Sequence, residues 1–76
     1  MKLNFTVSCG YDFAEVVSEL GSYRSATGAV IESQDSVARE VTVKVPKIEY
    51  YLHLVMTSDI AEAIKLNTKI MRDRRR

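Results

Sequence analysis

Three segments of this chain alternate between apolar and polar residues, which favours β-strands with one buried face. In residues 2–9 every second side chain is apolar, the pattern of a half-buried strand. The same period of two returns in residues 41–45 and in residues 48–56. Pro46 separates these two segments and has no N–H to donate to a ladder. We therefore expect two antiparallel strands joined tightly at residues 46–47, rather than one long bent strand.

The stretch 22–36 gives the weakest signals in the chain. Residues 22–28 are typical of a loop, residues 29–32 of a short strand and residues 34–36 of a turn. A helix that runs on through Tyr23 is the alternative for this stretch.

An amphipathic helix is predicted over residues 13–20. Asp12 and Glu15 have the spacing of a capping box, in which each side chain satisfies a free backbone N–H of the other residue. Gly21 is expected to end the helix in a left-handed conformation. The predicted apolar stripe consists of Phe13, Val16, Val17 and Leu20.

A second amphipathic helix is predicted over residues 60–73, with residues 74–76 as a frayed basic tail. The net charge is only +1, but residues 65–76 hold six Lys/Arg against one Asp, while residues 1–64 hold five Lys/Arg against nine acidic residues. We therefore expect a basic stripe opposite the apolar stripe of this helix. The cationic side chains are Lys65, Lys69, Arg72, Arg74, Arg75 and Arg76.

The predicted order of elements is β-α-β-β-β-α, in a single domain spanning residues 1–76. A chain of 76 residues buries about 60% of its unfolded surface, enough for one thin core. Four half-buried strands need apolar cover, which two amphipathic helices supply from one side. The expected fold is a two-layer α+β sandwich, with an antiparallel sheet of three to four strands whose other face is open.

The composition indicates a cytoplasmic protein. No apolar signal region follows Met1, and no segment approaches the ~18 apolar residues that a membrane span needs. Cys9 is the only cysteine, so the chain forms no internal disulfide, and a reducing compartment is the simplest interpretation.

The sequence argues against an enzyme, and we expect no cofactor, metal or small-molecule substrate. Cys9 and His53 are the only pair of residue types suited to a nucleophile and its base. Cys9 belongs to the apolar side of the first strand and His53 to the outward side of the strand at 48–56, so the sheet should separate them. Glu15 and Glu19 lie on a solvated helix face, which does not suit paired acid–base chemistry.

The leading hypothesis is a protein-binding regulator or inhibitor that acts through the open sheet face or a sheet edge, with a homodimer as one form of that contact. Tyr51, His53 and Val55 belong to the outward set of the strand at 48–56. They are the expected centre of the interface, because tyrosine is enriched at protein interfaces. The inward set of the same strand is Ile48, Tyr50, Leu52, Leu54 and Met56.

The alternative is a weak RNA- or DNA-binding module that uses the basic stripe of the C-terminal helix. Five or six cations make such binding strongly salt-dependent. The predicted element order, the opening residues 1–6 and the basic C-terminal helix resemble the ribosome hibernation factors, and the last five elements resemble the order in double-stranded-RNA-binding domains. This resemblance implies RNA binding, whereas the helix at 13–20 contains no Lys or Arg.

Overall fold

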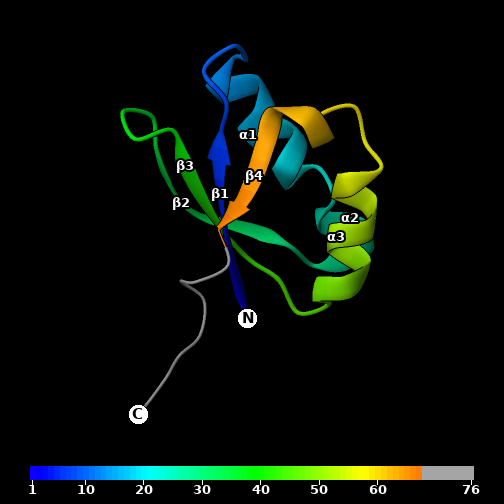
Figure 1. Cartoon of the computed structure of the whole chain (residues 1–76). Helices are drawn as coiled ribbons and strands as arrows, with labels where there is room; N and C mark the ends of the chain where they lie inside the picture. The colour runs from blue at the N-terminus through cyan, green and yellow to red at the C-terminus, as the bar shows by residue number, and fades with distance from the viewer. Residues whose placement is uncertain (68–76) are drawn as a thin grey trace.

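The computed structural model describes residues 1–67 as a four-stranded sheet with helices packed against it (Figure 1). The expected α+β fold is confirmed, although the order of its elements differs from the prediction. The elements are β1 (Lys2–Val7), α1 (Phe13–Gly21), α2 (Arg24–Thr27), β2 (Val30–Asp35), β3 (Glu40–Lys44), α3 (Ile48–Met56), the 3-10 helix η1 (Ala61–Ala63) and β4 (Ile64–Asn67).

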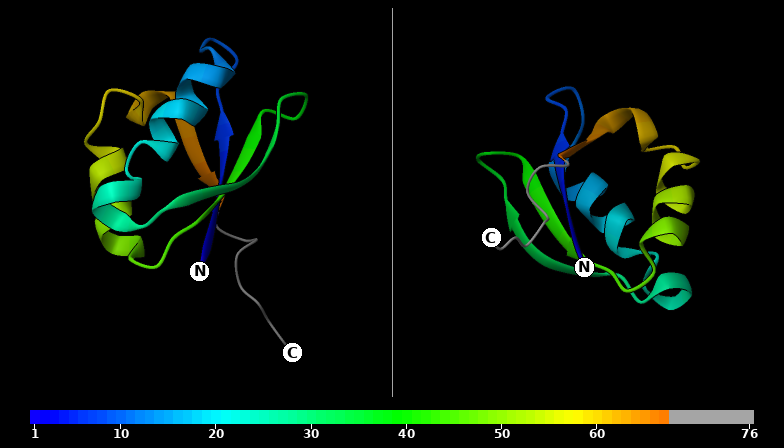
Figure 2. Two further views of the ribbon diagram at one scale, coloured as in Figure 1. Left: turned by 180° about the vertical axis from the view of Figure 1, so that it is seen from behind. Right: turned by 60° about the horizontal axis from the view of Figure 1, so that its bottom comes forward.

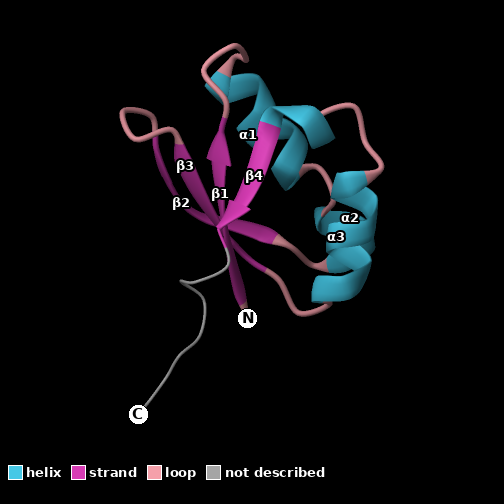
Figure 3. Ribbon diagram, viewed as in Figure 1, coloured by secondary structure: helices cyan, strands magenta, loops and turns pink. Residues whose placement is uncertain are grey.

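The sheet has the strand order β2-β3-β1-β4, and all neighbouring strands are antiparallel. β1 and β2 therefore run parallel with β3 between them, and β3 and β4 run parallel with β1 between them. This is the split β-α-β arrangement of ferredoxin-like folds. The helices α1 and α3 lie on the crossovers between the parallel strands and cover the same face of the sheet (Figure 2, Figure 3).

The prediction of a strand at residues 48–56 is wrong, because these residues form the helix α3. The strands before and after α3 are parallel, and such strands need a long crossover, which is usually helical. The hydroxyls of Thr57 and Ser58 donate hydrogen bonds of 2.8 and 2.6 Å to the carbonyls of His53 and Val55. The same two carbonyls also accept the backbone N–H groups of Thr57 and Ser58, both at 3.1 Å, so backbone and side-chain donors together cap the C-terminal end of α3.

The prediction of a helix from residue 60 is also wrong for the residues that the structure describes. Residues 61–63 form a short 3-10 turn without a side-chain cap. Residues 64–67 form β4, which pairs with β1 so that Lys65 lies opposite Thr6. The remainder of the predicted helix, with the basic tail at 74–76, lies outside the described residues.

The first predicted helix is confirmed, since α1 spans residues 13–21 and Asp12 Oδ1 accepts the N–H of Glu15 at 3.2 Å. The role predicted for Gly21 is wrong, because Gly21 is the last residue of α1 and the C-cap, Ser22, has a right-handed conformation. A Cβ at residue 21 would lie 3.3 Å from Ile31 Cγ1. Gly21 is thus the point where α1 passes close to β2.

The stretch 22–36 contains more structure than its sequence predicts. The expected loop at residues 22–28 includes the one-turn helix α2. The expected strand at 29–32 is longer and becomes β2, with a bulge between Ile31 and Ser33. The turn lies at residues 36–39 rather than 34–36.

One hydrophobic core fills the space between the sheet and the helices. Cys9 is not part of it, contrary to the prediction: β1 ends at Val7, and Cys9 is exposed in the loop that follows. None of the helices within residues 1–67 is long and apolar enough to cross a membrane. The largest fully buried side chains are Tyr51, Phe5, Leu20, Val7, Val41, Val43, Val45 and Val55.

Candidate functional site

The contact surface predicted from Tyr51, His53 and Val55 does not exist. Tyr51 and Val55 are 0% exposed and lie on the side of α3 that faces the core. His53 is exposed, as expected, but it lies on a helix and not on the open face of the sheet. The prediction failed because it applied a period of two to residues that repeat every three to four positions.

Tyr51 instead joins α3 to α1 inside the core. Its hydroxyl donates a hydrogen bond of 2.9 Å to the carbonyl of Leu20. Its ring meets Tyr23 edge-on at 6.0 Å and lies 6.5 Å from Phe5. Burial raises the pKa of Tyr51, with a smaller contribution from Tyr23, so the hydroxyl keeps its proton and acts as a donor.

The open face of the sheet is polar. Asn67 donates to Asn4 Oδ1 at 2.7 Å and to Thr6 Oγ1 at 2.8 Å, and Asn4 donates to Thr42 Oγ1 at 3.1 Å. These hydrogen bonds link β3, β1 and β4 across the face. The side chains therefore satisfy one another and stabilise the sheet, which leaves fewer free groups for a ligand.

Lysines surround this polar network. Lys2 lies opposite Lys44 in the β1–β3 register, and Lys65 lies opposite Thr6. Lys2 forms an ion pair of 2.8 Å with Glu32 of β2. Among the described residues, no aromatic side chain shares this face with the network, so it lacks the stacking platform on which single-stranded nucleic acids bind.

The cations of the nucleic-acid hypothesis are not brought together by the described structure. Lys65 is exposed on β4, in a strand rather than on a basic helical stripe. The other five cations, Lys69, Arg72, Arg74, Arg75 and Arg76, lie outside the described residues.

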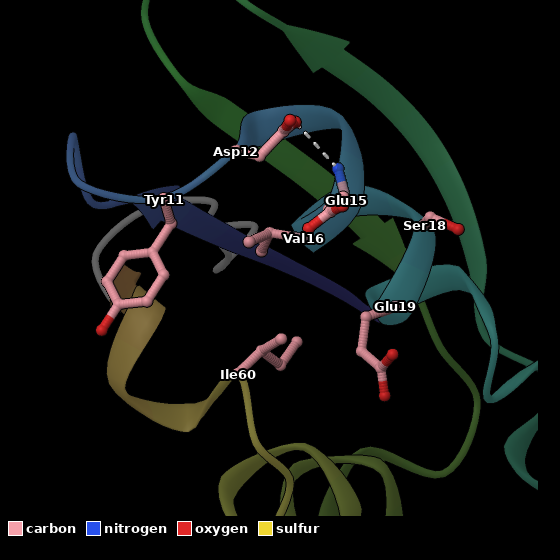
Figure 4. Close-up of a pocket in the computed structure, with 7 residues that line it drawn as sticks. All are labelled: Tyr11, Asp12, Glu15, Val16, Ser18, Glu19 and Ile60. Carbon is pink, nitrogen blue, oxygen red and sulfur yellow. Dashed lines mark hydrogen bonds between the residues drawn. The ribbon is translucent and has the colours of Figure 1, made fainter.

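A groove of about 330 Å³ runs along α1, opposite the segment that follows α3 (Figure 4). Two of its three carboxylates have structural roles: Asp12 caps α1, and Glu19 Oε2 accepts the hydroxyl of Tyr23 at 3.4 Å. Glu15 is the third and is exposed. The groove thus offers a ligand few carboxylates beyond those that hold α1 in place. Its lining residues are Tyr11, Asp12, Glu15, Val16, Ser18, Glu19 and Ile60.

The side of α3 that faces away from the core exposes large apolar side chains. Seven of the nine residues of α3 are apolar, all except Glu49 and His53. Both polar residues lie on the exposed side of α3, and two large apolar side chains are exposed beside them: Tyr50 is 48% exposed and Met56 is 43% exposed. We call Glu49, Tyr50, His53, Leu54 and Met56 the outer face of α3.

The sequence contained a signal for this face that the strand prediction overlooked. Ile48, Tyr51, Leu52 and Val55 follow the i, i+3, i+4, i+7 spacing of a buried helical stripe. This spacing assigns Tyr51 and Val55 to the core. The residues predicted to point inward, Tyr50 and Met56, are then the exposed ones.

Catalytic and metal-binding arrangements do not emerge from residues 1–67. Cys9 lies in the loop after β1 and His53 lies on α3. Within the described residues, no three His, Cys, Asp or Glu side chains are grouped to hold a metal ion. The chain matches no protein-family model, no curated protein and no solved structure.

Proposed function

We propose that this protein is a non-enzymatic protein-binding module that regulates or inhibits its partner through the outer face of α3. The observation that carries the proposal is that two large apolar side chains, Tyr50 and Met56, are exposed on the outer face of α3. Exposed apolar side chains that share one face of an element mark protein–protein contacts more often than the scattered apolar residues found on any surface.

The types of side chain on this face support the same proposal. Tyrosine and methionine are both enriched at protein interfaces, where the ring and the thioether bury a large area. Tyr50 and Met56 lie on either side of His53, at three-residue spacing along the helix. Residues three or four apart are neighbours on a helix surface, so Tyr50, His53 and Met56 form a continuous row.

The open sheet face is a weaker candidate for the same role. The side chains at its centre are amides and hydroxyls that hydrogen-bond to one another. An interface core depends on apolar and aromatic side chains, which the outer face of α3 provides. We include a cytoplasmic location in the proposal, because an exposed free cysteine such as Cys9 suits a reducing compartment.

Site-specific photo-crosslinking in the native host tests the proposal. A photoreactive benzoylphenylalanine at position 50 should yield a covalent adduct with a protein, whatever that protein is. The matched control carries the same residue at position 37, since Val37 is also apolar and is 93% exposed at the tip of the β2–β3 hairpin.

An adduct from position 50 and none from position 37 supports the proposal. Equal labelling from both positions, or none from position 50, contradicts it. Retention of the wild-type protein on heparin that disappears at moderate salt, without any adduct at position 50, would favour the nucleic-acid alternative.

A further inference from the structure

We propose that mild acid weakens the protein contact made by the outer face of α3, because protonation of His53 places a positive charge at the centre of that contact. This inference rests on the proposed function and names a regulation of the same face. His53 is the only histidine among the 76 residues. Histidine is the one side chain whose ordinary change of charge falls between pH 5 and 8. A response of the side chains to pH in this range is therefore centred on the outer face of α3.

His53 lies on the side of α3 that points away from the core. At 3.6 residues per turn, it lies about 160° around the helix from Val55, and Val55 is fully buried. Tyr50 precedes His53 by three residues and Met56 follows it by three, so both are its neighbours on the helix surface. A partner that covers these two apolar side chains must therefore also cover the imidazole between them.

The charged groups around α3 do not compensate a proton on His53. The neighbouring helices contact α3 on its buried side, through Tyr51, and the strands beneath it carry their charges on the open face of the sheet. Within residues 1–67 the ion pair joins Lys2 to Glu32, so no carboxylate is paired with His53. The charged residues of α1, α2, α3 and the segments next to α3 are Glu15, Glu19, Arg24, Lys47, Glu49, Asp59 and Glu62.

The direction of the effect follows from the cost of removing a charge from water. Apolar groups can cover a neutral imidazole at a small cost, whereas a covered imidazolium without a counter-ion loses its hydration and gains no partner. Glu49 lies four residues before His53 on the same face and is exposed. An exposed pair at this spacing is weak, so the cost of desolvation exceeds the attraction to Glu49. Binding therefore weakens as the pH falls.

Photo-crosslinking at two pH values tests the inference. The chain with benzoylphenylalanine at position 50 is titrated into a lysate of the native host and irradiated, at about pH 7.5 and at about pH 5.5. The measured quantity is the concentration of the chain that gives half of the maximal adduct. Histidine side chains gain their proton within this range, so this concentration should rise about tenfold at the lower pH.

Variants with a fixed charge at position 53 identify the residue that is responsible. His53→Gln stays neutral and should form the adduct equally well at both pH values. His53→Lys is positively charged at both pH values and should form it poorly at both. Glu49→Gln is the matched control on the same face, and it should keep the response to pH. These side chains are exposed, and circular dichroism at both pH values checks that every variant is folded.

The results separate this inference from the function on which it rests. A loss of adduct in acid that His53→Gln prevents and Glu49→Gln does not prevent supports the inference. An adduct that forms equally well or better at the lower pH, or that is lost to the same extent in His53→Gln, overturns the inference and leaves the protein-binding function intact. The absence of any adduct from position 50 at the higher pH overturns both.

Discussion

The hydroxyl of Tyr51 donates a hydrogen bond to the backbone carbonyl of Leu20, and this bond joins the two helices that cover the sheet. Leu20 lies in the last turn of α1, where carbonyls have no partner within the helix. Tyr51 thus caps α1 from a neighbouring helix while its ring fills the core. Tyr51, which was predicted to lie at the centre of a contact surface, is instead part of the hydrophobic core.

Removal of this hydroxyl should destabilise the fold without creating a cavity. Tyr51→Phe leaves the Leu20 carbonyl buried and unpaired, which should lower the free energy of unfolding by about 1–2 kcal/mol. Urea denaturation followed by circular dichroism measures the change. Tyr50→Phe is the control, because the Tyr50 side chain is exposed and its loss of a hydroxyl should change stability by less than about 0.5 kcal/mol. Equal effects of the two variants would contradict the role of Tyr51.

The same residue should make the protein sensitive to alkali. Burial raises the pKa of Tyr51 above its ordinary value of 10.0, so above that pH the unfolded chain loses this proton more readily than the folded chain. The contribution of Tyr51 to stability is therefore fully present below about pH 10. It is lost at up to roughly 1.4 kcal/mol per pH unit as the pH rises further.

Unfolding of wild type and Tyr51→Phe at pH 8 and at pH 11 isolates this contribution, because all other groups titrate in both proteins. The stability advantage of the wild type at pH 8 should shrink or reverse at pH 11. An advantage that stays constant across this range would show that the folded and unfolded states bind this proton equally.

Arg39 should hold the loop after β1 against the β2–β3 hairpin. Its guanidinium donates to the carbonyls of Val7 at 3.1 Å, of Ser8 at 2.8 Å and of Tyr11. Lysine keeps the charge but not the planar group that reaches all three acceptors. Arg39→Lys should therefore lower stability by about 1–2 kcal/mol and speed hydrogen exchange in the loop.

Arg24→Lys provides the control for that variant, since Arg24 is exposed on α2. Its effect on stability and on exchange should be negligible. If Arg39→Lys leaves hydrogen exchange of the loop amides unchanged, backbone hydrogen bonds around β1 are sufficient to hold this loop without the Arg39 side chain.

Two glycine substitutions should have opposite consequences. Gly28 has φ of +79°, and a Cβ there would lie 3.1 Å from Pro46 Cγ. Gly28→Ala should therefore cost about 1–2 kcal/mol. Gly10 has nothing within 4 Å of such a Cβ, so Gly10→Ala should be neutral or slightly stabilising. Thermal melts of both variants test this, and a stable Gly28→Ala protein would contradict the strained geometry assigned to residue 28.

The strands β1 and β3 and the helix α1 were predictable because their patterns allow one interpretation. Leu3, Phe5 and Val7 alternate with polar residues, and only a strand buries such a set on one side. In α1, the Asp12 cap and the apolar stripe agree with each other. In α1, the capping signal and the apolar periodicity thus predict the same structure.

The segments predicted wrongly carry patterns that fit two structures. The residues of α3 are apolar at almost every position, so a period of two and a period of 3.6 both find matches in them. At residues 60–67 the reverse occurs, since Ile60, Ala63 and Ile64 fit a helical stripe while Ile64 and Leu66 also alternate. The outer face of α3 was missed for this reason, because Tyr50, Leu54 and Met56 were assigned to the buried side.

By itself the sequence determined the α+β class, the first strand, the first helix and the strand at 41–45, since each of these buries its apolar residues in only one conformation. The tertiary structure decided the conformation of residues 48–67. β3 pairs with one edge of β1, and β4 pairs with the other edge. Because β4 runs parallel to β3, the chain must cross over the sheet between these two strands. Such a crossover is usually helical; here it contains the helix at 48–56 and leads into the strand at 64–67. It therefore also decides that Tyr51 enters the core and that Tyr50 meets the solvent.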